Sequence, residues 1–224
     1  MRFPTLCSVA LFVAAPLSAQ AFQGTIAMRA SDPQSGAVMD MTVYTDGTKQ
    51  AMVMTAVGGP AAGREMRAVI NPATRKMTML IAMPGMPGGA KGMKMVTDFG
   101  SNDTDASAAA PTIKQLGTKQ TIAGMSCDDY EITADGNTFF MCGTAALGRY
   151  TLPDMNQGGR NANRPAWANA FGDRPFFPLK VWTKENSVSM EVTSVKRGAV
   201  AAEVFDENPA GYMTAPAMPG ARRN

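Results

Sequence analysis

The chain of 224 residues contains no histidine, and this absence excludes the chemistry that depends on an imidazole side chain. Ser-His-Asp and Cys-His nucleophile systems, His-ligated zinc or iron, and the usual proton shuttle at neutral pH all need that group. Cysteine is also scarce, with 3 residues in the whole chain. The composition therefore indicates a protein that is not an enzyme and has no cofactor.

An excess of one charge is missing as well. The chain carries 21 basic and 18 acidic residues, which are mixed along the sequence and leave a net charge of +3. Such a mixture provides no extended basic surface of the kind that nucleic acids bind. The length fits one globular domain or two small ones at most. We therefore expect no nucleic-acid partner.

The first 21 residues have the features of a secretory signal peptide. Arg2 supplies the basic start, residues 6–17 form an apolar run, and residues 19–21 (Ala-Gln-Ala) form a small-x-small cleavage site. A bilayer-spanning helix needs about 20 apolar residues, and no segment of the chain reaches that length. We expect a mature chain that starts near Phe22, has no membrane span and is soluble in the periplasm.

Removal of the signal peptide leaves two cysteines, Cys127 and Cys142. An even pair in an exported chain favours a disulfide. The segment between them is predicted to form a hairpin around residues 134–137, because the Asp-Gly pair there tolerates the positive φ of a tight turn. The C-x-x-C spacing of redox-active dithiols is absent. The sequence therefore predicts a structural disulfide.

Period-two alternation of apolar and polar residues dominates the chain from Phe22 onward and predicts half-buried strands. About ten antiparallel strands joined by sequential hairpins should form one large, curved sheet. Residues 100–111 lack periodicity and predict a long loop between the two halves of this sheet. Asp46-Gly47 predicts a two-residue turn that places Met41 opposite Met52 and Met39 opposite Met54.

Four Met-x-Met pairs fall on predicted strands: Met39 and Met41, Met52 and Met54, Met77 and Met79, and Met93 and Met95. Each pair points to one side of its strand, with Cα atoms about 6.7 Å apart. Methionine fills irregular apolar space and suits surfaces that bind varied apolar ligands. Soft thioethers also suit copper(I). An apolar binding cavity, a copper(I) site and a filled core of a structural or interaction protein stay open as roles.

Two further segments differ from the strand pattern. Residues 165–171 predict a short helix, with Pro165 at its start and Trp167 and Phe171 one turn apart. The Pro-, Gly- and Arg-rich tail at 213–224 predicts disorder. The adjacent carboxylates Asp128 and Asp129 point to opposite faces of a predicted strand and are expected to be solvated.

Several segments, in a fixed order, resemble the exported bacterial family called domain of unknown function 4412. They are residues 22–26 (FQGTI), 69–72 (VINP), 76–79 (KMTM), 121–130 (TIAGMSCDDY), 177–181 (FPLKV) and 209–212 (PAGY). That family is similar in fold to periplasmic lipoprotein carriers typified by lipoprotein-localisation factor A, an open half-barrel whose concave face holds acyl chains.

The resemblance implies a mainly β fold over residues 22–212: one large, curved antiparallel sheet, an open half-barrel, with one or two short helices as a lid. The methionine faces would line the concave side, and the segment around Trp167 would belong to the lid. The implied role is the binding or transport of a lipid or another apolar ligand.

Overall fold

Twelve β-strands form a single sheet in the part of the chain that the computed structural model describes, which is residues 22–32, 36–58, 62–86, 89–98, 111–134, 136–148, 171 and 174–215. The strands are β1 (Gly24–Ser31), β2 (Val38–Thr45), β3 (Gln50–Ala56), β4 (Glu65–Asn71), β5 (Lys76–Ala82), β6 (Gly92–Asp98), β7 (Thr112–Ile122), β8 (Met125–Ala134), β9 (Asn137–Thr144), β10 (Phe177–Thr183), β11 (Val188–Arg197) and β12 (Tyr212–Thr214). The predicted signal peptide lies outside the described residues.

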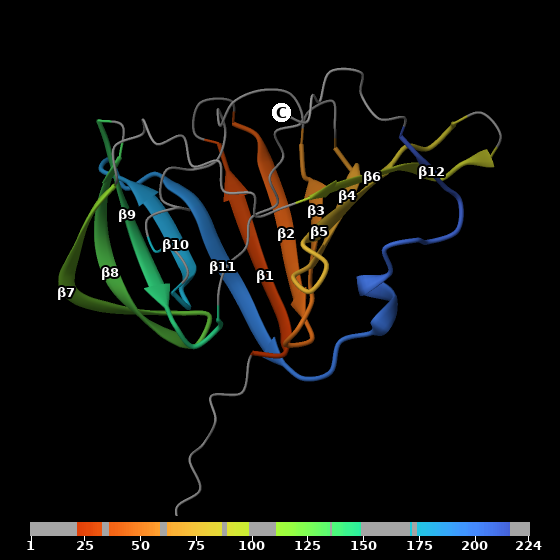
Figure 1. Cartoon of the computed structure of the whole chain (residues 1–224). Helices are drawn as coiled ribbons and strands as arrows, with labels where there is room; N and C mark the ends of the chain where they lie inside the picture. The colour runs from red at the N-terminus through yellow and green to blue at the C-terminus, as the bar shows by residue number, and fades with distance from the viewer. Residues whose placement is uncertain are drawn as a thin grey trace, which may run out of the picture.

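The sheet is open and strongly curved, as the sequence predicts (Figure 1). Its strand order is β12-β6-β5-β4-β3-β2-β1-β11-β10-β9-β8-β7. Strands β1 to β6 and strands β7 to β11 each follow one another as antiparallel neighbours. The two halves meet where β1 pairs with β11, so β7 forms one edge of the sheet and β6 lies next to the opposite edge strand, β12. The loop predicted at 100–111 therefore does not join neighbouring strands.

One pair of strands departs from the predicted antiparallel sheet. Strand β12 lies parallel to β6, with Tyr212 beside Gly92 and Thr214 beside Lys94. Met213 and Thr214 thus belong to the sheet, and the disorder that the sequence predicts from residue 213 is wrong for these two residues. The rest of that tail, from residue 216, lies outside the described residues.

The expected helical lid is not found among the described residues. Their single helical element is the 3-10 turn η3 (Ala202–Phe205), which lies against β3 and β4, where Phe205 packs on Ala51 and Val69. These two residues point away from the main core, so η3 covers the outer face of the sheet. The helix predicted at 165–171 lies outside the described residues except for Phe171. No helix in the described ranges is long and apolar enough to cross a membrane.

Alternation along the strands separates two faces. On β1, Ile26 and Met28 are buried, whereas Arg29, the next residue, is exposed and forms a two-bond ion pair with Asp40 of β2 (2.7 and 3.1 Å). The hydrogen bonds from Arg29 hold the pKa of Asp40 below its ordinary value. The concave face therefore carries the core, and the convex face meets solvent.

The β2–β3 connection differs from the predicted two-residue turn. Thr45 pairs with Gln50, so the loop holds four residues, 46–49. Asp46 Oδ1 accepts hydrogen bonds from the Thr48 amide (2.8 Å), the Thr48 hydroxyl (2.8 Å) and the Lys49 amide (2.6 Å). This side-chain capping stabilises a longer loop than the Asp-Gly pair alone predicts. The predicted register was wrong by two residues: Met41 faces Met54, and Met39 faces Ala56.

The Asp46 loop leads to a prediction about stability and pH. Burial raises the pKa of Asp46, but the hydrogen bonds from Lys49 and Thr48 outweigh burial and leave the pKa below its ordinary value of 3.8. The stabilisation that the ionised Asp46 carboxylate provides is therefore present above pH 3.8 and is lost as the pH falls through its lowered pKa. Urea unfolding of Asp46→Ala should show a loss of about 1 kcal/mol at pH 7. The difference between wild type and Asp46→Asn should shrink between pH 7 and 3; a constant difference would contradict this role.

Candidate functional site

Methionines pair directly across neighbouring strands on the concave face. Met28 of β1 faces Met41 of β2, Met41 faces Met54 of β3, and Met54 faces Met66 of β4. The same line continues through Ile81 of β5 to Met93 of β6. We call Met28, Met41, Met54, Met66 and Met93 the methionine row. It crosses six adjacent strands with one interruption.

Two parallel lines of residues accompany the methionine row. One holds Val43, Met52, Ala68, Met79 and Met95, and the other holds Gln50, Ile70, Met77 and Thr97. The methionine row and these two lines hold seven of the eight methionines of the Met-x-Met pairs. The eighth, Met39, shares the concave face because it alternates with Met41 on β2 and packs against the main core cluster. Met28 and Met66 belong to the same face but were missed, because neither stands in a Met-x-Met pair.

Burial varies along these lines. Met52 and Met77 are almost fully buried, and Met41, Met54 and Met79 are also buried. Met39, Met66, Met93 and Met95 are half-buried, and all of these except Met93 pack against the main core cluster. The face thus combines a packed centre with partly accessible thioether side chains.

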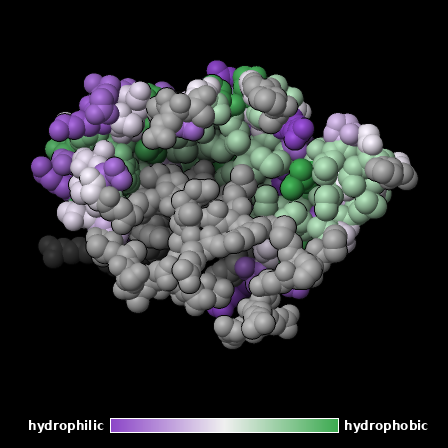
Figure 2. Space-filling view, turned by 90° about the horizontal axis from the view of Figure 1, so that it is seen from above, coloured by the Kyte–Doolittle hydropathy of each residue, from purple (hydrophilic) through white to green (hydrophobic). Residues whose placement is uncertain are grey.

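Exposed apolar side chains also gather at one end of the sheet. In Figure 2 green residues cluster at the end where β6 and β12 lie, and purple residues mark the end of β7 to β9. The exposed side chains include Met83 (40%) and Met213 (49%), and Met213 lies beside Met93 of the methionine row. Val96 is also exposed at this end (48%), but it lies opposite Thr78 on the outer face of the sheet. The apolar character of the concave face therefore extends to this edge.

An aromatic cluster occupies the other half of the core. The rings of Phe171 and Phe176 stack with centroids 3.4 Å apart, and Tyr130 meets both edge-on at 5.4 and 5.6 Å. Gly143 leaves room for this cluster, because a Cβ atom there would lie 1.9 Å from Phe176 Cζ. Burial, with a smaller contribution from the charge of Asp128, raises the pKa of Tyr130. Phe171 thus packs on the core, while Trp167 lies outside the described residues.

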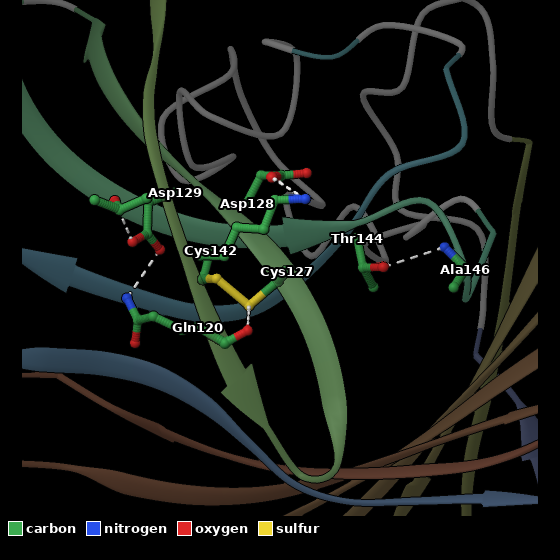
Figure 3. The surroundings of a disulfide bond; sticks show 9 residues. Gln120, Cys127, Asp128, Asp129, Cys142, Thr144 and Ala146 are labelled. Carbon is green, nitrogen blue, oxygen red and sulfur yellow. Dashed lines mark hydrogen bonds and ion pairs between the residues drawn. A yellow bond between two sulfur atoms is a disulfide. The ribbon is translucent and has the colours of Figure 1, made fainter.

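The predicted disulfide is present. Cys127 and Cys142 join β8 to β9, with Cα atoms 5.4 Å apart, and both residues are buried (Figure 3). The residue directly opposite Cys142 is Asp129, so Cys127 lies diagonally across the two strands. The bridge fixes the hairpin beside the aromatic cluster.

Asp129 is buried, contrary to the expectation that it is solvated. Its carboxylate accepts hydrogen bonds from the Thr118 hydroxyl (2.7 Å) and the Gln120 side-chain amide (2.8 Å), both on β7 (Figure 3). The neighbouring Asp128 is half-buried, and its Oδ1 atom lies 3.4 Å from Lys119 Nζ. Because the β7–β8 register shifts between Gln115 and Lys119, the two hydrogen bonds of Asp129 anchor the bulged edge strand to β8.

Three buried side-chain oxygens of the described residues have no hydrogen-bond partner: Gln50 Oε1, Thr97 Oγ1 and Thr183 Oγ1. Gln50 Oε1 and Thr97 Oγ1 are both buried, at the two ends of the line that also holds Ile70 and Met77. A buried polar group without a partner typically costs about 1–3 kcal/mol. Sequence reasoning missed these residues, because alternation alone does not show which polar atoms lack partners.

A metal site built from the usual ligands is not found in the described ranges, since no group of three or more His, Cys, Asp or Glu side chains converges there. The donor atoms that this face offers are thioethers. Chemically, the face can pack apolar groups or ligate a soft metal ion.

One open, curved, largely antiparallel sheet with an apolar concave face places the protein in the half-barrel class. The chain belongs to the family described as Domain of unknown function (DUF4412), which it matches over residues 22–212. The resemblance stated from the sequence is confirmed. No curated protein matches the sequence.

Three solved structures to which the chain is similar share little sequence with it. An uncharacterized conserved protein from Thermus thermophilus is 8% identical, with a TM-score of 0.49 over 88% of this chain and 91% of that chain. PNGF-II is 15% identical, with a TM-score of 0.46 over 88% and 32% of the two chains. The MucA/MucB complex of Pseudomonas aeruginosa gives 14% identity and a TM-score of 0.41 over 88% and 58%.

The disulfide provides a test of stability in this half of the sheet. Reduction of the wild-type protein should lower the free energy of unfolding by about 3 kcal/mol, the value expected for a closed loop of 15 residues. Chemical unfolding with and without a thiol reductant measures the difference. The Cys127→Ala/Cys142→Ala variant is the matched control and should not respond to the reductant. An equal stability of oxidised and reduced wild type would contradict a stabilising role.

Proposed function

We propose that this protein is an exported, non-catalytic protein of the periplasm that binds or carries an apolar ligand, such as a lipid or an acyl chain, on its concave face. The observation that carries the proposal is the methionine row, which aligns flexible apolar side chains across six adjacent strands. Methionine has an unbranched, polarizable side chain that repacks around varied shapes.

The distribution of burial supports this role. A core that serves stability alone favours branched side chains with few rotamers, whereas methionine specifies packing poorly. Here the half-buried Met39, Met66 and Met95 border the packed centre of the face. An apolar chain that covered these side chains would gain about 25 cal/mol per Å² of apolar surface removed from water.

The disulfide and the first 21 residues support export. A disulfide persists in oxidising compartments and is rare in the cytosol, and Cys127 and Cys142 are joined. The absence of histidine from the sequence underlies the non-catalytic assignment.

Titration with a fluorescent fatty acid tests the proposal. The Met39→Glu/Met66→Glu variant should bind the probe at least about tenfold more weakly than wild type, because burying an unpaired carboxylate against an acyl chain is costly. Both residues are half-buried, so the substitutions should leave the fold intact, which circular dichroism checks. Thr42→Glu, on the outer face of β2, is the matched control and should bind like wild type. No binding by wild type, or equal binding by all three proteins, would overturn the proposal.

A copper(I)-handling role is the second candidate, favoured by the same row for a different reason. Residues that face each other on antiparallel strands have Cα atoms about 4.5–5.5 Å apart, so neighbouring thioethers can converge on one ion. Met28, Met41, Met54 and Met66 supply four such groups on consecutive strands. Thioether sulfur is a soft ligand that suits copper(I).

Methionine-to-leucine variants separate the two candidates. Leucine conserves side-chain volume but removes the sulfur, so the core should stay folded. In a copper(I) titration against a competing chelator, Met28→Leu/Met41→Leu/Met54→Leu/Met66→Leu should lose saturable binding if copper is the ligand, whereas the control Met77→Leu/Met79→Leu should retain it. Unchanged copper binding in the first variant, or none in wild type, would exclude this candidate. If wild type bound neither copper(I) nor the fatty acid, both binding roles would be excluded. A structural role with a filled core would then be the remaining interpretation.

A further inference from the structure

Strand β12 closes one edge of the sheet with few contacts. It pairs with β6 over 3 residues, in the parallel orientation that is slightly less stable per residue than the antiparallel one. The Lys91 amide donates to the Gly211 carbonyl oxygen (2.7 Å) just before this pairing. The Ala215 amide donates to the Lys94 carbonyl oxygen (2.8 Å) just after it. So short an edge strand opens at a lower free energy than the whole sheet unfolds.

The segment that leads to β12 is held more firmly. Phe205 of η3 is buried against the outer face of the sheet. Arg67 of β4 donates hydrogen bonds to the backbone oxygens of Glu203 (3.1 Å) and Asp206 (3.4 Å). Strand β12 can therefore leave the edge of β6 while η3 stays in place.

Two thioethers meet where β12 contacts β6. Met213 and Met93 are directly paired, and paired residues on neighbouring strands point to the same side of the sheet. Met213 is exposed and Met93 is half-buried, whereas Met52 and Met77, at the centre of the same face, are almost fully buried. An oxidant in solution therefore reaches the thioethers at this edge before those at the centre.

Oxidation changes the polarity of a methionine side chain. Hypochlorous acid transfers its oxygen atom to the thioether: an S–O bond forms, the O–Cl bond breaks, sulfur loses two electrons, and chloride and a proton leave. The product, methionine sulfoxide, is polar and is reduced back to the thioether by methionine sulfoxide reductases. A sulfoxide oxygen that two paired strands withdraw from water loses hydrogen bonds, so its formation favours separation of the strands.

We propose that Met93 and Met213 form an oxidation site for hypohalous acids, and that their conversion to sulfoxides releases β12 from β6. Release exposes the hydrogen-bonding edge of β6 and the Met93 side chain at the end of the methionine row. Return of the sulfoxides to thioethers closes the edge again. The inference concerns this edge alone and does not depend on an apolar ligand of the concave face.

Graded treatment of the folded protein with hypochlorous acid, followed by peptide mass spectrometry, tests the first step. Met213 and Met93 should be oxidised at least about tenfold faster than Met52 and Met77, because the buried thioethers become accessible only when the sheet opens. Equal rates for the two pairs of methionines would overturn the inference.

Amide hydrogen exchange of the oxidised protein tests the second step. The Lys91 and Ala215 amides, which bond between β6 and β12, should lose protection by about tenfold or more. The Val57 amide, which donates to the Val38 carbonyl oxygen (2.9 Å) away from this edge, should keep its protection. Treatment with methionine sulfoxide reductases should restore the protection of the first two amides.

Three variants separate these two methionines from oxidation elsewhere. Met93→Leu/Met213→Leu conserves side-chain volume but removes the sulfur, so it should stay protected before and after treatment. Met83→Leu is the matched control, because Met83 is exposed but bonds to Lys91 of β6 rather than to β12, and it should open like wild type. Met213→Gln places a polar group at the same position and should lose protection without any oxidant.

Three results would overturn the inference. They are unchanged amide exchange in wild type whose Met93 and Met213 are oxidised, opening of Met93→Leu/Met213→Leu by the oxidant, and full protection of the edge in Met213→Gln.

Discussion

The pairing of β1 with β2 on one side and with β11 on the other is the interaction on which the rest of the structure depends. It joins two sets of sequential hairpins into one sheet, and it aligns their residues across the junction. Met28 faces Met41 in one half and Val192 in the other. Without β1 between them, the methionine half and the aromatic half would be two separate curved sheets, each with an open apolar face.

The two faces of this sheet follow from the same alignment. On the convex face, charges pair across the strands, as Arg29 does with Asp40 and Lys180 with Glu191. Exposed ion pairs of this kind contribute little stability. The concave face buries the apolar side chains, and their packing stabilises the sheet. The face that stabilises the protein is therefore also the face that we propose for binding, which explains why half-buried methionines lie next to fully buried ones.

Period-two alternation was sufficient to predict the mainly β class, the curved sheet and the shared face of the eight paired methionines. It could not show which strands are neighbours, because the pattern of β1 contains no information about β11. The β2–β3 register was wrong because the Asp46 side chain closes a longer loop. Asp129 was misassigned because its partners Thr118 and Gln120 come from the edge strand. Gln50 and Thr97 became visible only once the neighbours of each polar atom were known.

The central claim is that the concave face holds an apolar ligand in the cell. Native mass spectrometry of the mature protein purified from the periplasm, followed by lipid extraction of the same sample, tests this claim most directly. The account predicts a bound species in stoichiometric amount that the extraction releases as a lipid or acyl-chain compound. A protein that arrives without any bound species would contradict it.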